Sequence, residues 1–247
     1  MRWLIPFCLS GLATSACAAG DVPICDDEMF EGVRMTVCAF DPAAGLSLYR
    51  ADANGDPYGS LKAVRADHPD AAFLMNAGMY HADLSPVGLY VEDGVQAAPL
   101  VKGASPGNFG LVPNGVFWID GGQAGVEETG AFAASGRTPA FATQSGPMLI
   151  IDGAIHPKFI ATSTSEKLRN GVGVAGDEVI FMLSRDPVNF HRFARAFATR
   201  GADNALFLDG TISQLWTEDT GTVGGRSGLL GRYPVGPVVG WVPGAEE

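Results

Sequence analysis

Short apolar runs that end at glycine-containing turns make up most of this chain. Examples are FLMNAGMY (73–80), VGLYVEDG (87–94), MLIIDG (148–153) and VGVAGDEVIFMLS (172–184). Apolar runs of this length, bounded by turn residues, are typical of buried strands rather than helices. The 33 glycines and 16 prolines among 247 residues leave few stretches that can continue as long helices. The pattern therefore predicts a strand-rich fold with short connections.

The one convincing long helix covers residues 186–201. The residues that share its apolar face are Phe190, Phe193, Ala194 and Phe197. Asp186 is expected to cap the helix, and Gly201 is expected to end it. A shorter helix is expected after Ser60, another capping residue.

Two segments have the pattern of β-hairpins. Residues 33–40 and 45–50 flank a proline–glycine break, and residues 169–184 form two strands about a Gly-Asp turn. No linker, repeat or low-complexity tract interrupts the chain. We therefore expect one α+β domain over residues 20–247, with one or more strand-rich mixed sheets and a few helices.

The first 19 residues have the pattern of a secretory signal peptide. Arg2 supplies the positive charge, residues 3–13 are mostly apolar, and small residues follow, with a cleavage site near residues 18–19. The apolar stretch is too short to span a membrane. A lipid anchor on Cys17 is the alternative interpretation. The mature protein is therefore predicted to be periplasmic or secreted.

The cysteines and the net charge limit the function further. Cleavage leaves only Cys25 and Cys38, which suggests one disulfide worth about 3 kcal/mol in an oxidising compartment. A net charge of −11 without a run of Lys or Arg argues against nucleic acid or an anionic membrane as a partner. Neither cysteines nor histidines have metal-ligand spacing, so no metal or other cofactor is expected. The oligomeric state is left open.

Two catalytic motifs fail the test of their context. Residues 171–176 (GVGVAG) match a dinucleotide-binding loop, but a strand follows where that motif needs a helix. Residues 103–107 (GASPG) match a nucleophile elbow around Ser105, but no helix follows and Pro106 lacks a backbone N–H. A hairpin and an ordinary turn explain these matches better than a dehydrogenase or a serine hydrolase.

Four segments place polar residues where an apolar strand ends in small residues. They are residues 73–80, 142–153, 166–174 and 206–215. The candidate site residues in them are Asn76, Gln144, Ser145, Gly146, Arg169, Asn170, Asp209, Thr211 and Ser213. Each has an ordinary interpretation as a turn residue. Together they favour a site, because polar groups at strand ends lie where a rigid scaffold meets solvent.

The motifs FLMNAGMY, QSGPMLIIDG, RNGVGV and LFLDGTISQL, in this order, resemble the phosphodiester glycosidase family. The resemblance covers residues 25–243 and points to the bacterial exported branch of the family. Two motifs differ from the common pattern. N-A-G-M-Y stands where N-G-G-F-F is common, and D-G-T-I-S stands where D-G-G-G-S is common.

The resemblance implies hydrolysis of the bond between an anomeric carbon and phosphate in a sugar-1-phosphodiester. Asp209, Arg169 and Asn76 are then expected to be catalytic, with Arg169 binding the phosphate. The residues expected to bind substrate are Asn170, Gln144, Ser145, Gly146, Thr211 and Ser213. The bulkier D-G-T-I-S motif leaves an alternative, a non-catalytic envelope module that binds a glycan or a protein in the same cleft.

Overall fold

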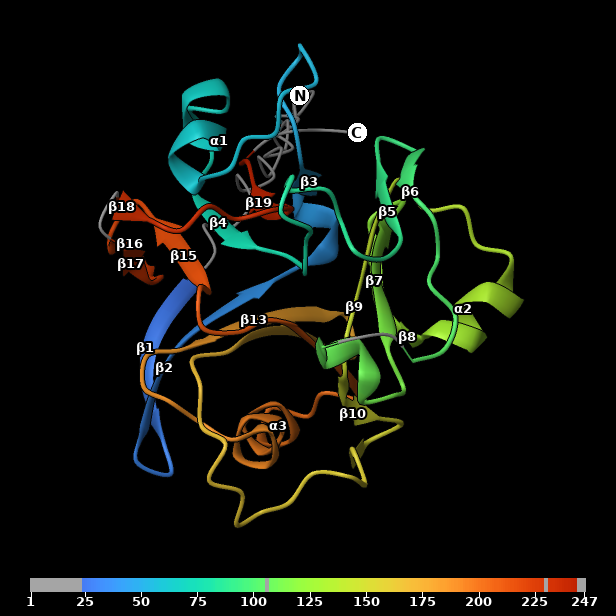
Figure 1. The fold of residues 1–247 in the computed structure, drawn as a ribbon, viewed down its shortest axis with the longest axis vertical. Coiled ribbons are helices and arrows are strands. Elements are labelled where there is room, and N and C mark those ends of the chain that lie inside the picture. Colours follow the sequence, from blue (N-terminus) through green and yellow to red (C-terminus); the bar gives the residue numbers. More distant parts are fainter. Residues whose placement is uncertain (1–23, 105–106, 229–230, 244–247) are drawn as a thin grey trace, which may run out of the picture.

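Three β-sheets surround one central core, and each sheet has an α-helix on its outer face (Figure 1). This computed structural model describes residues 24–104, 107–228 and 231–243. The helices are α1 (Leu61–Asp67), α2 (Thr129–Ser135) and α3 (Phe190–Thr199). Two 3-10 turns, η1 (Pro42–Ala44) and η2 (Gly107–Gly110), complete the helical elements among these residues.

All neighbouring strands in the three sheets are antiparallel. Sheet A has the order β1 (Ile24–Phe30), β2 (Val33–Phe40), β13 (Glu178–Ser184), β12 (Asn170–Ala175), β14 (Asn204–Asp209), β10 (Met148–Ile151) and β11 (Ala154–Ile155). Sheet B has the order β16 (Gly221–Gly224), β15 (Gln214–Thr217), β4 (Phe73–Asn76), β19 (Val238–Trp241) and β3 (Leu46–Tyr49). Sheet C has the order β6 (Val95–Ala98), β5 (Tyr90–Glu92), β9 (Phe141–Ser145), β7 (Gly115–Asp120) and β8 (Gln123–Glu128). β17 (Ser227–Gly228) and β18 (Gly231–Arg232) form a separate short pair.

The alternation of side chains along β14 connects the central core to the layer under α3. Leu206 and Leu208 are fully buried in the central core, which takes residues from all three sheets. Ala205 and Phe207 point to the opposite face, where they pack in the cluster that includes α3. Successive strand residues point to opposite faces, so a strand this apolar must be covered on both. Sheet A is therefore buried between the central core and α3 at this strand.

The predictions of a strand-rich α+β fold and of the disulfide are confirmed. Cys25 and Cys38 are direct partners across β1 and β2 and are joined by a disulfide. Residues 170–184 form the predicted hairpin, so residues 171–176 are part of a strand and its turn, not a dinucleotide-binding loop. Ser60 caps α1 and accepts a hydrogen bond from the Ala63 N–H at 3.1 Å.

Two local predictions are wrong. Residues 33–40 and 45–50 do not pair as a hairpin, because β2 lies in sheet A between β1 and β13 whereas β3 lies in sheet B. The α3 helix is capped by Asn189, whose side chain accepts from the Arg192 N–H at 2.9 Å. Asp186 instead binds Arg34, with a 2.7 Å ion pair.

The predicted signal peptide, with Cys17, and the Ser105 of the rejected elbow motif lie outside the described residues. Within the described part of the chain, no helix is long and apolar enough to cross a membrane.

Candidate active site

The segment LFLDGTISQL runs from one sheet into another. β14 ends at Asp209 in sheet A, residues 210–213 cross over, and β15 begins at Gln214 in sheet B. In Figure 1 this crossing is the orange connection that leads into β15. The backbone groups of the crossing have no continuous ladder to join, so side chains satisfy several of them. This is the physical reason for a carboxylate, a glycine and hydroxyl groups at the end of an apolar strand.

Two buried asparagines hold Asp209 in place from neighbouring strands. Asn76, the last residue of β4, donates from Nδ2 to Asp209 Oδ2 at 2.8 Å. Asn170, the first residue of β12, accepts the Asp209 backbone N–H at 2.7 Å. Asn170 Nδ2 also donates to Asn76 Oδ1 at 3.0 Å and to the Asn76 carbonyl at 2.6 Å. The three predicted residues Asn76, Asn170 and Asp209 are therefore brought together.

The orientation of the Asn76 amide is fixed by its partners. Its Oδ1 accepts from Asn170 Nδ2 and, at 2.8 Å, from the Gln214 backbone N–H. A flipped amide would place its NH₂ group against these two donors. Nδ2 therefore faces Asp209, and this one side chain joins β4, β12, β14 and β15.

The surroundings of Asp209 raise the pKa of its carboxyl group to about 6. Burial is the largest cause, and hydrogen bonds from the Gly210 N–H at 2.6 Å and from Asn76 oppose it. Burial disfavours the charged form of a carboxyl group. Asp209 thus changes charge near pH 6, in the range in which a carboxylate can exchange a proton or act as a nucleophile.

Tyr80 is a neighbour of Asp209 that the sequence prediction did not include. The pKa of its phenol is raised to about 12, first by burial and then by the negative charge of Asp209. Its hydroxyl group donates to the carbonyl oxygen of Pro234. The sequence did contain an indication of this residue, because the family that the motifs resemble often has phenylalanine where this chain has Tyr80. Tyr80 thus stays protonated at neutral pH and connects the Asp209 site to residues near Pro234.

The two predicted serines and the predicted glycine shape the backbone around the crossing. Ser213 is fully buried, and its Oγ donates to the Gly210 carbonyl at 2.5 Å. Ser145 is also fully buried and donates to the Leu208 carbonyl at 3.0 Å. Gly146 follows directly, and a Cβ atom there would lie 2.0 Å from the Asn114 Oδ1. These residues lie beside the strand end, with their hydroxyl groups bonded to carbonyl oxygens.

Gln144 and Thr211 differ in their surroundings. Gln144 is buried in sheet C, and its side chain bonds the backbone of Leu89 and Val101 at 2.8–3.0 Å. Its amide therefore fastens that segment to the sheet. Thr211 is partly exposed in the crossing. Substrate binding by either residue stays a prediction.

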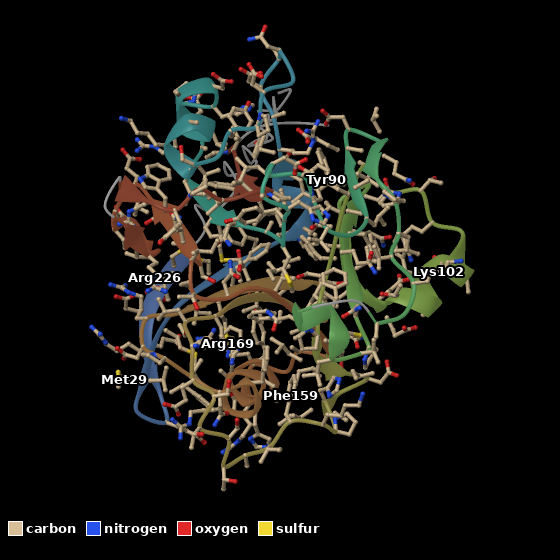
Figure 2. The ribbon with its side chains drawn as sticks, in the orientation of Figure 1. Met29, Tyr90, Lys102, Phe159, Arg169 and Arg226 are labelled. Atoms are coloured by element: carbon tan, nitrogen blue, oxygen red, sulfur yellow. A yellow bond between two sulfur atoms is a disulfide. The ribbon has the colours of Figure 1, made fainter. Side chains whose placement is uncertain are left out.

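Arg169 is a buried cation without an acidic partner among the described residues. The side chain is 3% exposed, and burial lowers its pKa to about 10. Its guanidinium lies 3.6 Å over the ring of Phe190 and donates to the carbonyl oxygens of Val188 at 2.8 Å and Ser165 at 3.2 Å. Figure 2 shows Arg169 in the interior, above α3 in this view. Two of its nitrogens are thus occupied, and its predicted role in binding phosphate stays a prediction.

An aromatic layer separates Arg169 from the strand end. Phe190 meets the ring of Phe207 edge to face, with centroids 4.9 Å apart. The tip of the Phe207 ring would lie 3.7 Å from a Cβ atom on Gly210. Arg169 therefore lies on the α3 side of the segment that carries Asp209, whereas the adjacent Asn170 bonds to Asp209 directly.

A separate cavity of about 750 Å³ lies between α2 and residues 102–114. Lys102, labelled in Figure 2, and Glu128 are its charged lining residues. None of the nine predicted catalytic or substrate-binding residues lines it. Across the described ranges, no group of three or more His, Cys, Asp or Glu residues is placed to hold a metal ion.

The sequence and the fold match those of a known protein family. The model of the phosphodiester glycosidase family matches residues 70–230, which include Asn76, Asn170 and Asp209. The chain belongs to this family, as its motifs predicted.

Among individual proteins, the chain is 38% identical to the uncharacterised protein YigE of Escherichia coli over 176 residues, 69% of each chain. The catalytic domain of zebrafish N-acetylglucosamine-1-phosphodiester alpha-N-acetylglucosaminidase, auto-inhibited by its pro-peptide, has a similar fold. Its TM-score is 0.63 at 14% identity, over 91% of this chain and 86% of that one. A hypothetical protein from Synechocystis gives a TM-score of 0.59 at 15% identity. That match covers 87% of this chain, which spans only 61% of the other.

Proposed function

We propose that the protein is an exported hydrolase that cleaves the bond between the anomeric carbon of a sugar and phosphate in a sugar-1-phosphodiester of the cell envelope. The observation that carries the proposal is Asp209, a carboxyl group with a pKa of about 6 held by Asn76 and by the Gly210 N–H. The phosphodiester glycosidase family to which the chain belongs supports the reaction class.

The leaving group explains how one carboxylate can serve. Cleavage of a sugar-1-phosphodiester at the anomeric carbon releases a phosphate monoester, which is a stable anion, whereas the aglycone of an ordinary glycoside leaves as an alkoxide that a second carboxyl group must protonate. Above pH 6, ionised Asp209 activates water, attacks the anomeric carbon or stabilises the positive charge that develops on the sugar. Asn76 holds the carboxylate directly, and Asn170 holds the Asp209 backbone N–H and the Asn76 side chain, so the carboxylate keeps one geometry, which supports each of these roles.

The phosphate needs positive charge, and Arg169 is our candidate to supply it. A buried guanidinium without an acidic partner is costly, and a bound anion offsets that cost. Guanidinium groups also match phosphate oxygens in geometry. Because Phe190 and Phe207 lie between Arg169 and the strand end, phosphate binding by Arg169 requires that this aromatic pair shift. A bidentate contact also requires that Arg169 release the Ser165 carbonyl, the longer of its two hydrogen bonds at 3.2 Å.

Export is supported by the leader-like first 19 residues and by the Cys25–Cys38 disulfide. Disulfides persist mainly in oxidising compartments such as the periplasm.

The test is release of free sugar from a panel of sugar-1-phosphodiesters, among them UDP-N-acetylglucosamine, by the purified mature chain. Asp209→Asn is the key variant, and Asp203→Asn, an exposed carboxylate near the start of the same strand, is its matched control. We expect folded Asp209→Asn to lose at least about 10²-fold in rate, the usual scale for an acid–base group, and Asp203→Asn to keep the native rate. Full activity in Asp209→Asn would refute the role of Asp209. Binding of the panel without turnover would favour the binding module instead.

A further inference from the structure

Beyond Glu218 and Asp219, the chain that follows the Asp209 site is free of carboxylates up to residue 243. Residues 220–243 contain two arginines, Arg226 and Arg232, and neither Asp nor Glu, although the whole chain carries a net charge of −11. An anionic substrate is repelled by most of such a surface and is drawn to any local positive region. This stretch is therefore electrostatically suited to meet an anion beside the site.

Part of this stretch is bonded to the site. We call residues 224–226 and 232–234 the lip. The Gly225 N–H donates to the Ser213 carbonyl at 2.6 Å, and Gln214 Nε2 donates to the Tyr233 carbonyl at 3.3 Å. Tyr80, the neighbour of Asp209, donates its hydroxyl hydrogen to the carbonyl of Pro234. Three contacts thus hold the lip against the crossing segment and the neighbour of Asp209.

The register of the lip places Arg226 and Tyr233 together. Ser227 pairs with Arg232 across β17 and β18, and the Tyr233 N–H donates to the Arg226 carbonyl at 3.0 Å. Arg226 is therefore opposite Tyr233, and residues directly opposite in an antiparallel pair share a face. Tyr233 is 48% exposed and is one of the few exposed large hydrophobic side chains of the described residues. Figure 2 shows Arg226 at the outside of the molecule, on the same side of the view as Arg169.

Arg232 points to the other face and supports the lip from behind. Its guanidinium donates to the Gly224 carbonyl. A Cβ atom on Gly225 would lie 2.5 Å from this guanidinium and 2.8 Å from the Gln214 side chain. Gly225 therefore allows the lip to pack closely on Gln214, and Arg232 acts as a positioning residue for the Arg226–Tyr233 face.

We propose that the Arg226–Tyr233 face binds the group on the far side of the scissile phosphate, and that it selects a group in which a further anion adjoins a flat ring, as in a nucleotide. Arg226 pairs with the additional phosphate, and the exposed ring of Tyr233 stacks on the flat ring. This inference rests on the proposed function, because it names the leaving-group side of that substrate.

The experiment is isothermal titration of the mature chain with uridine 5′-diphosphate, uridine and inorganic phosphate at low ionic strength. We expect the diphosphate to bind at least about tenfold more tightly than uridine or phosphate. Arg226→Gln and Tyr233→Ala should each weaken it about tenfold, the scale of one charge-assisted hydrogen bond or one stacked ring. Lys62→Gln, an exposed cation on α1, is the matched control and should bind as the native chain does.

Two outcomes overturn the inference: equal binding of the diphosphate and uridine, or native affinity in both lip variants with native thermal stability. Sugar release from a methyl phosphodiester, measured in parallel with the native chain, separates this result from the proposed function. If sugar is released but the diphosphate binds no better than uridine, the lip proposal fails and the hydrolase stands. If the diphosphate binds through the lip and no sugar is released from any phosphodiester, the hydrolase fails and the binding face stands.

Discussion

Ionised Asp209 should destabilise the fold, and its replacement by asparagine should therefore change how stability depends on pH. The pKa of Asp209 is raised from 3.8 to about 6 in the folded chain. Between these values the unfolded chain has already released the proton and the folded chain still holds it. Proton binding to the folded state alone is a stabilising contribution that is present at pH 4 and lost as the pH rises through about 6.

The size of the effect follows from the shift. About two pH units at 1.36 kcal/mol each give about 2–3 kcal/mol. Asp209→Asn cannot become charged, so it escapes this loss. It also places an NH₂ group against either the Asn76 Nδ2 or the Gly210 N–H, which costs about 1–2 kcal/mol at every pH.

The assay is urea denaturation of the native chain, Asp209→Asn and the Asp203→Asn control at several pH values from 4 to 8. We expect the difference in unfolding free energy between Asp209→Asn and the native chain to move by about 2–3 kcal/mol in favour of the variant from pH 4 to pH 8. Comparison with Asp203→Asn corrects the difference in unfolding free energy for the general effect of removing a carboxylate from the chain. A difference that is constant with pH would refute the raised pKa and with it the argument for the catalytic role.

Three further predictions concern other parts of the structure. Inorganic phosphate should raise the melting temperature of the native chain more than sodium chloride of equal ionic strength, and Arg169→Met should abolish that extra rise; equal rises in both proteins would exclude Arg169 as the anion site. Gly146→Ala should lower the unfolding free energy by about 1–3 kcal/mol, because its Cβ meets Asn114 Oδ1, and Asn114→Ala in the same chain should recover part of the loss; additive losses in urea would contradict this contact. Replacing both Cys25 and Cys38 by serine should cost about 3 kcal/mol in the same assay, and an unchanged denaturation midpoint would show that the disulfide adds nothing to stability.

Local sequence patterns were sufficient for the hairpin at residues 170–184 and for the break in LFLDGTISQL. Both depend on turn residues next to apolar strands, which act within a few residues of one another. Residues 33–40 and 45–50 show where this fails. Their break leads from sheet A to sheet B, and the choice between a hairpin and a change of sheet depends on β13 and β19, far along the chain.

The candidate site could be predicted from the sequence to a similar extent. Asn76, Asn170 and Asp209 could be grouped because each ends or begins an apolar strand. The direction of the Arg169 side chain could not be predicted. It depends on the residue at which β12 begins, and on the fact that the next residue, Asn170, points toward Asp209. Tyr80 was missed for a related reason, since its effect requires Pro234, 154 residues away.

The shared central core also bears on how the site can be lost. Asn76 and Asp209 come from strands whose adjoining residues, Met75 and Leu208, are fully buried in that core together with residues of sheet C. No sheet can therefore separate from the others without opening the layer that supports the carboxylate. Unfolding of sheets A, B and C should therefore be one cooperative event. The geometry around Asp209 should remain intact until that event, without an earlier local loss.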